Sequence, residues 1–155
     1  MYEGPDDPRP AAAAGTNVLV DAFAPGAAEA ILEHLETAGA PMAAAQIRVL
    51  GGAMARMPDD ATAFGYRGAK LMVNVAAMYE NPEEGPEHEA WAGSLATALS
   101  DGTPAAYVGF LGDDGEQGVR RAYPPATLQR LAEVKRQYDP DNLFRLNLNV
   151  PPAVK

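Results

Sequence analysis

Apolar residues recur along the chain at two spacings, which predict helices and strands in mixed order. In the segment 27–38 they recur at helical spacing, and Pro25 and Gly39 bound the segment. In the segment 71–78 a run rich in valine, leucine and methionine predicts a buried strand. On the same grounds we expect helices at 27–38, 87–99, 116–122 and 124–138, and strands at 17–20, 46–50, 71–78, 105–111 and 146–150. This order predicts an α+β fold, with a mixed or antiparallel sheet covered by helices on one face.

The segment 1–16 has a different composition from the rest of the chain. It carries several prolines, an alanine run and almost no large apolar side chain. Such a segment buries too little surface to offset the entropy of ordering it. We therefore expect a flexible lead-in at 1–16, followed by a single α+β domain at 17–155.

Composition excludes several classes of partner. The chain has 155 residues, a net charge of -9 and no cysteine. The negative charge argues against nucleic acid or an anionic membrane as a partner, and the missing thiols exclude disulfides and thiolate chemistry. No apolar run has the roughly 18 residues of a membrane span, and the first residues do not read as a secretory signal. These patterns predict a cytoplasmic protein.

Standard catalytic and metal-binding motifs are absent from the sequence. The glycine-rich stretch Gly51–Arg56 lacks the spacing of a nucleotide-binding loop, and Asp113–Glu116 lacks the alternating ligands of a calcium loop. His34 and His88 each stand beside glutamates, and neither has a second histidine one helical turn away. We expect both histidines at the surface and no metal site.

Tyr107 is the best candidate for chemistry on the residues alone. In the alternating segment 105–111 it would share a strand face with Ala105, Gly109 and Leu111. Small neighbours leave open space around its hydroxyl, which suits a tyrosine that projects into a cavity. A core tyrosine whose hydroxyl bonds to the backbone fits the same spacing.

Several unrelated pieces stand in a fixed order in the last third of the chain. They are the strand with Tyr107, the helix 124–138, the Asp139–Pro140 turn before Leu143 and Phe144, and the segment Asn147–Pro152. This order resembles the C-terminal segment of the berberine-bridge-enzyme-like family of FAD-linked oxidases. The resemblance runs from about Phe23 to Pro152 and includes the stretches 51–54 and 61–67.

The resemblance implies a role for each of a small set of polar residues. In this family the strand with the tyrosine typically reads Tyr-x-Asn, and its tyrosine faces the substrate and the flavin. Tyr107 would then be the catalytic acid or base. Asn147 and Asn149 would contact the flavin, and Arg67 and Asn74 would line the substrate pocket.

The sequence also departs from the family pattern. Gly109 replaces the asparagine of Tyr-x-Asn, Pro124 replaces a glycine, and Leu148 replaces a glutamine near the terminal prolines. Asn74 stands where some members carry a catalytic carboxylate. The FAD-binding domain of the family has no counterpart in this sequence, so FAD is expected from the family but not as a ligand of this chain alone.

The first hypothesis is therefore the substrate-side, C-terminal portion of an FAD-dependent oxidoreductase that oxidises a small organic substrate. A separate FAD-binding domain would be its partner, and the isolated chain would be inactive. A cofactor-free domain that binds a small molecule or another protein is the alternative, and a translated remnant that folds poorly and has no activity is a third. The strand 146–150, without its usual neighbours, should promote self-association.

Overall fold

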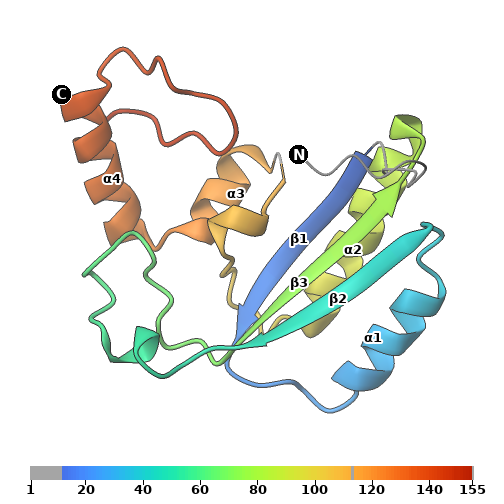
Figure 1. Ribbon diagram of the computed structural model, residues 1–155. Helices are drawn as coiled ribbons and strands as arrows, with labels where there is room; N and C mark the ends of the chain where they lie inside the picture. Colours follow the sequence, from blue (N-terminus) through green and yellow to red (C-terminus); the bar gives the residue numbers. More distant parts are fainter. Residues whose placement is uncertain (1–11, 113, 155) are drawn as a thin grey trace, which may run out of the picture.

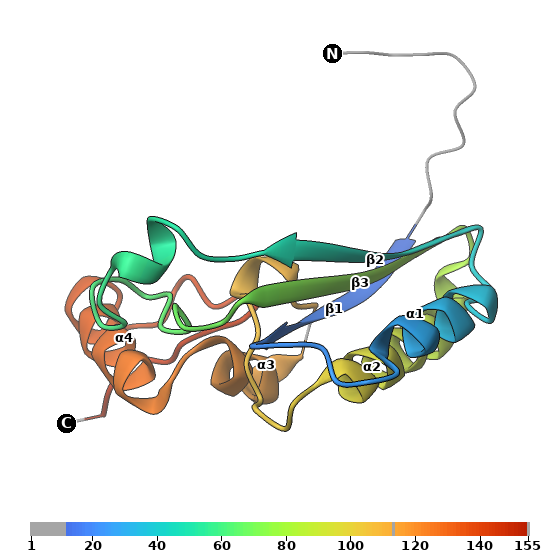
Figure 2. The same ribbon diagram turned by 90° about the horizontal axis from the view of Figure 1, so that it is seen from below.

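The computed structural model describes residues 12–112 and 114–154, and these form a three-stranded antiparallel sheet with helices on one face (Figures 1 and 2). The strands are β1 (Ala12–Val20), β2 (Met42–Val49) and β3 (Leu71–Tyr79). The helices are α1 (Ala27–Glu36), α2 (Gly85–Leu99), α3 (Gly115–Ala122) and α4 (Pro125–Tyr138). Short 3-10 turns lie at Met54–Arg56, Pro82–Glu84 and Val108–Phe110. The predicted α+β class is confirmed.

Strand β3 is the centre of the sheet, whose order is β1-β3-β2. Val73 lies opposite Val18 of β1 and Ile47 of β2. β3 is buried on alternate residues, because its odd-numbered side chains point toward the helices and its even-numbered ones point away. Helices α1 and α2 both lie below the sheet in Figure 2, so only one face is covered by helix.

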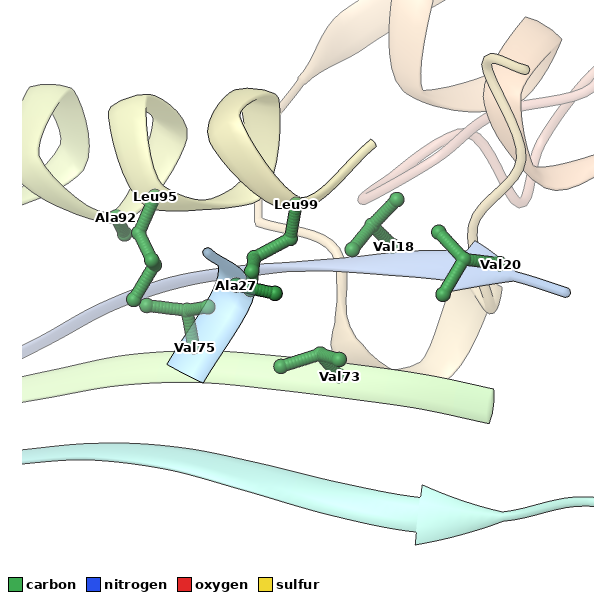
Figure 3. Close-up of a cluster of buried hydrophobic side chains, with 8 residues drawn as sticks. All are labelled: Val18, Val20, Ala27, Val73, Val75, Ala92, Leu95 and Leu99. Atoms are coloured by element: carbon green, nitrogen blue, oxygen red, sulfur yellow. The ribbon is translucent and has the colours of Figure 1, made fainter. Parts of the chain in front are cut away.

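The main core lies between the sheet and α2 (Figure 3). It contains Val18, Val20, Ala27, Val73, Val75, Ala92, Leu95 and Leu99. Each fully buried valine or leucine contributes about 1.5–3 kcal/mol relative to an exposed one. The Trp91 indole donates a hydrogen bond to the His34 carbonyl at 2.8 Å, which ties α2 to α1.

Strands β1 and β2 both begin earlier than the sequence pattern predicts. Residues 1–11 lie outside the described part of the chain, but Ala12–Thr16 belong to β1, so a flexible lead-in through residue 16 is wrong for these five. Their small side chains pair with β3, and Ala14 and Thr16 are buried. β2 starts at Met42 rather than at 46, because its alanines pair with the end of β3.

The strands expected at 105–111 and 146–150 are not formed. The chain is extended through Tyr107 and then turns at Val108–Phe110. The Leu19 amide donates to the Ala105 carbonyl at 3.0 Å, so 105–107 follow the outer edge of β1 for only a short distance. In the second segment Asn147 has a φ of 60°, a left-handed conformation that interrupts an extended chain.

His88 is buried rather than at the surface, so that expectation is wrong. It lies on the same helical stripe as Ala92, Leu95 and Leu99, whereas the neighbouring Glu87 and Glu89 point outward. Its ring packs on Tyr79 with centroids 4.5 Å apart. Helical periodicity therefore outweighs the charge of its sequence neighbours.

Candidate functional site on the open face of the sheet

The sheet face opposite α1 and α2, which we call the open face, carries a row of amide side chains. Asn74 of β3 lies in register with Asn17 of β1 and with Gln46 of β2. All three have the side-chain parity that points away from α1 and α2, which lie below the sheet in Figure 2. Gln46 is exposed and Asn74 is partly exposed, so these two amides can meet a polar ligand, whereas Asn17 is buried.

One end of the open face is covered by the segment between β2 and β3. Leu19 and Met72 pack there against Leu50, Phe64, Tyr66, Ala69, Ala105 and Phe110. Arg67 holds this segment together, because it donates to the Met54 carbonyl at 3.0 Å and to the Thr62 hydroxyl at 2.6 Å. Only 7% of Arg67 is exposed, so it braces the segment from within.

Asn17 fixes the backbone of Tyr107. Its side-chain amide donates to the Tyr107 carbonyl at 3.0 Å, and its Oδ1 accepts from the Tyr107 amide at 2.7 Å. Asn17 is completely buried. A side chain thus replaces the backbone of β1 as the partner of Tyr107, and the chain leaves the sheet edge toward the open face. This is the physical reason why the predicted strand stops at Tyr107.

The Tyr107 ring lies in a small aromatic cluster, with 40% of the residue exposed. Its centroid is 6.1 Å from that of Phe64 and 5.7 Å from that of Phe110. The Arg48 guanidinium lies 4.7 Å from the Phe110 centroid, and that of Arg67 lies 5.8 Å from the Phe64 centroid. The phenol hydroxyl forms no hydrogen bond within the described residues, so Tyr107 is not the satisfied core tyrosine that its spacing also allowed.

Gly109 allows this position of the ring. A Cβ added to Gly109 would lie 2.7 Å from Cε1 of Tyr107 and 3.3 Å from its Cζ. The ring therefore folds back over the glycine. An asparagine here, as in the family pattern, would require the Tyr107 ring to move.

Two further tyrosines near this region, Tyr66 and Tyr123, have a raised pKa. Burial raises the pKa of Tyr66. Burial also raises the pKa of Tyr123, and the nearby charge of an ionised Tyr107 raises it further. Both phenols therefore stay protonated, and uncharged, beyond the pH at which an ordinary tyrosine ionises.

The remaining predicted site residues take up distinct positions. Asn74 lies on the open face beside Asn17, whereas Arg67 reaches Tyr107 only through Phe64. Asn147 lines a hollow together with Val108 and Gly112, so it lies next to the turn that follows Tyr107. Asn149 has a buried Oδ1 without a hydrogen bond in the described part of the chain.

Sequence reasoning missed Asn17 and Arg121. Arg121 donates to the Asn17 carbonyl at 2.7 Å and to Asp114 at 3.2 Å, so it closes the edge of β1 beside the tyrosine. One signal was present, because Asn17 is a polar residue that opens the apolar run 18–20.

Within 12–112 and 114–154, no group of three metal-binding side chains gathers, and no helix has the length and apolarity to cross a bilayer.

Comparison with known proteins identifies the family. Residues 106–151 match the family described as berberine and berberine like. The FAD-linked oxidoreductase YgaK of Bacillus subtilis (strain 168) is 34% identical over 122 residues. Residues 106–151 therefore belong to the berberine and berberine like family, and the chain over 122 residues is similar to an FAD-linked oxidoreductase. The matched family segment includes Tyr107, Asn147 and Asn149, and it leaves out Asn17, Arg67 and Asn74.

The chain spans only part of its berberine-bridge-enzyme-like relatives. The YgaK match covers 79% of this chain and 27% of that protein. (R)-6-hydroxynicotine oxidase of Paenarthrobacter nicotinovorans is 40% identical over 60 residues, which are 37% of this chain and 13% of that protein. The chain thus corresponds to about a quarter of the length of YgaK.

Solved structures share the fold. The berberine bridge enzyme from Eschscholzia californica matches with a TM-score of 0.76 and 22% identity, over 96% of this chain and 34% of that one. The glycopeptide hexose oxidase DBV29, solved with teicoplanin, matches with a TM-score of 0.75 and 22% identity, over 91% of this chain and 32% of that one. The berberine-bridge-enzyme-like architecture therefore extends to β1, well before the family segment.

Proposed function

We propose that this chain is the substrate-side portion of an FAD-dependent oxidoreductase that oxidises a small organic molecule. The observation that carries the proposal is the position of Tyr107. A buried asparagine fixes its backbone, and its unbonded hydroxyl lies at the open face within the family segment. A flavin-binding polypeptide would act with this chain, which alone is not expected to retain the cofactor.

The residues of the open face fit one part of FAD. A flat ring can lie against a sheet face that offers amides and small side chains, and Asn74 and Gln46 provide two neighbouring amides there. Asn147 and Asn149 are candidates to meet the edge of the cofactor. No glycine-rich turn between a strand and a helix cradles a diphosphate in the described residues, so these residues alone offer no site for the remainder of FAD.

When bound, FAD supplies the hydride acceptor of the oxidation. The role we assign to Tyr107 is to orient the substrate hydroxyl or amine and to accept its proton. The hydroxyl suits this role because no hydrogen bond to a described residue competes for it. Asn74 would orient the substrate as a neutral amide, and Arg67 would support the pocket from beneath by holding the segment 54–67.

The test is reconstitution with the flavin-binding part of a relative. The portion of YgaK that this chain does not match would be produced with and without the chain, purified with FAD, and examined by its visible spectrum after gel filtration. We expect flavin to be retained by the pair and not by the chain alone. Flavin bleaching in the absence of oxygen, screened against alcohols, sugars and amines, then reports the substrate class.

Tyr107→Phe in the reconstituted pair should slow flavin reduction by about 10²-fold or more, the usual scale for a positioned general base. Tyr138→Phe is the matched control, because Tyr138 is exposed on α4, away from the open face. Equal rates for the two variants would end the catalytic assignment of Tyr107.

A cofactor-free interaction domain is the second candidate. The observation that favours it is the apolar stretch after α4, where 74% of Leu143, 78% of Phe144 and 85% of Leu146 are exposed. Exposed apolar residues in one segment mark a contact surface and should drive self-association. Light scattering that shows association, together with no flavin in any reconstituted pair, would support this candidate over the oxidoreductase.

A further inference from the structure

The outer edge of β1 is only partly paired. Because the Leu19 amide donates outward to Ala105, the alternate residues Asn17, Gly15 and Ala13 also direct their backbone groups away from β3. The Asn17 carbonyl accepts from Arg121. The backbone groups of Ala13 and Gly15 have no partner within the described residues. An unpaired row of this kind is a template for another strand.

A groove runs beside this unpaired edge. Its volume is about 540 Å³, and Ala13–Thr16 line one wall. α2 lies across β1 and provides Gly93, Ala96, Thr97 and Ser100 to the lining. Gly112 and Gln117 line it as well, as do the charged residues Glu89, Asp114 and Arg121. Small side chains beside an open strand leave room for a main chain whose alternate side chains point toward the helix.

Two features of the β1 edge limit the length of a strand that could pair with it. Residues 105–107 already occupy the edge beside Leu19, and Arg121 closes it at Asn17. The free stretch spans Ala13–Gly15, which at about 3.4 Å per residue is close to 10 Å. A short extended segment matches this length, whereas a helix could not bond to the outward backbone groups.

We propose that the β1 edge at Ala13–Gly15 binds an extended segment of the flavin-holding polypeptide and so gains a fourth strand. The proposal rests on the proposed function for the identity of this partner. The chain spans 27% of YgaK and 34% of the Eschscholzia californica enzyme, so most of such an enzyme lies outside it. The added strand continues the edge that 105–107 begin, and it extends the open face beside Asn17.

The experiment uses the full chain labelled with ¹⁵N and overlapping peptides of about ten residues that cover the unmatched part of YgaK. We expect at least one peptide to shift the amide resonances of Ala13, Gly15 and Gly93. The N–H of Ala13 points outward and does not bond to β3. Ala13→Pro removes this N–H and leaves the pairing with β3 in place, so it should weaken peptide binding about fivefold or more. Exchange protection of the Gly15 amide by the peptide provides a second readout if that variant does not fold.

Ala43→Pro is the matched control on the other side of the sheet. The Leu50 amide bonds inward to Lys70, so by alternation the N–H of Ala43 points away from β3 at the outer edge of β2. Its peptide affinity should stay within about twofold of the parent, well inside the effect of one lost hydrogen bond.

Three results would overturn the proposal. The first is a shift of the Ala13 and Gly15 resonances with protein concentration alone, which would make the groove an interface between two copies. Peptides that shift β2 instead, or no peptide that shifts either edge, would also refute it. Flavin retention does not enter this assay. Peptide binding at β1 with no flavin in the reconstituted pair would therefore refute the proposed function and leave the strand addition standing.

Discussion

The side chain of Asn17 and the backbone of Tyr107 form a two-way hydrogen bond across 90 residues of sequence, with N···O distances of 3.0 and 2.7 Å. The side-chain amide of Asn17 thereby takes the place of a neighbouring strand for one residue, Tyr107. This contact both ends the pairing with β1 and presents the phenol at the open face. The position of the best candidate for catalysis thus depends on a residue with no part in the chemistry itself.

Asn17→Leu should destabilise the fold by about 1–3 kcal/mol, because it leaves both the amide and the carbonyl of Tyr107 without a partner. Asn74→Leu is the control, since Asn74 is in register with Asn17 and its side chain bonds to no described residue. Its cost should stay within about 0.5 kcal/mol. Denaturant unfolding of the two variants measures the difference, and equal losses would show that the Asn17 bond contributes nothing specific.

Tyr107→Phe should change the free energy of unfolding by less than about 0.5 kcal/mol in the isolated chain. The reason is that 40% of Tyr107 is exposed and its hydroxyl forms no hydrogen bond to a described residue. Urea melts of the variant and the parent give the value. A loss well above 1 kcal/mol, the scale of a broken buried hydrogen bond, would mean that the hydroxyl has a partner in the folded chain.

Gly109→Ala should displace the Tyr107 ring, since the new Cβ would start 2.7 Å from Cε1. The ring is the flexible partner, so the fold should survive while the contact between Tyr107 and Phe110 changes. Aromatic proton chemical shifts and their cross-peaks report this directly. Gly112→Ala has open space, with its nearest atom 3.8 Å from the new Cβ, and should leave the ring spectrum as it is.

The sequence predicts the layers of this fold better than its edges. The valines of β3 and the stripe Leu95–Leu99 of α2 follow periodicities that burial imposes, so the core could be anticipated. The path after Tyr107 could not, because it depends on a side chain 90 residues away that competes with a backbone partner. The buried His88 follows from the helical stripe, yet the acidic neighbours concealed it.

In the candidate site, too, some residues could be predicted from a local sequence pattern and others could not. Tyr107, Asn147 and Asn149 could be named because they stand in a recognisable order, and their roles remain predictions. Asn17 and Arg121 contribute through contacts that no local pattern contains. Arg67 was expected to line a pocket, and this role remains a prediction; its guanidinium donates to Met54 and Thr62 within the segment between β2 and β3.

Acid should loosen the segment that follows α4. Asp139 bonds to Lys135 and accepts from the Leu143 and Phe144 amides at 2.8 and 3.1 Å. The hydrogen bond from Lys135, with those from the amides, holds the pKa of Asp139 below its ordinary 3.8. A lowered pKa stabilises the folded chain above pH 3.8, and this contribution is lost as the pH falls through the folded value.

Unfolding curves measured between pH 6 and 2 check this sign. Asp139→Asn should remove this part of the acid sensitivity and lower stability near neutral pH. Asp141→Asn, in the same turn, should keep the acid response of the parent. An Asp139→Asn curve that parallels the parent at every pH would contradict the assignment.

Gly118→Ala should destabilise the chain by about 1–3 kcal/mol through overpacking. The new Cβ would meet Leu148 at 2.8 Å and the Asp114 side chain at 2.6 Å. Gly93→Ala, where the added Cβ has no neighbour within 4 Å, should instead stabilise α2 by about 0.5–1 kcal/mol. In a Leu148→Ala background, Gly118→Ala should cost less free energy of unfolding than in the parent. If the costs of the two substitutions simply add, Leu148 does not pack on α3.

The exposed stretch Leu143–Leu146 also bears on the fate of the chain in a cell. Surface of this kind is what chaperones and proteases recognise in an unassembled polypeptide. Under the proposed function, copies made in excess of the proposed flavin-holding partner should therefore be cleared, and the amount of chain should follow the amount of that partner. Pulse-chase half-lives with and without the partner would show whether assembly, rather than synthesis, sets the abundance of this protein.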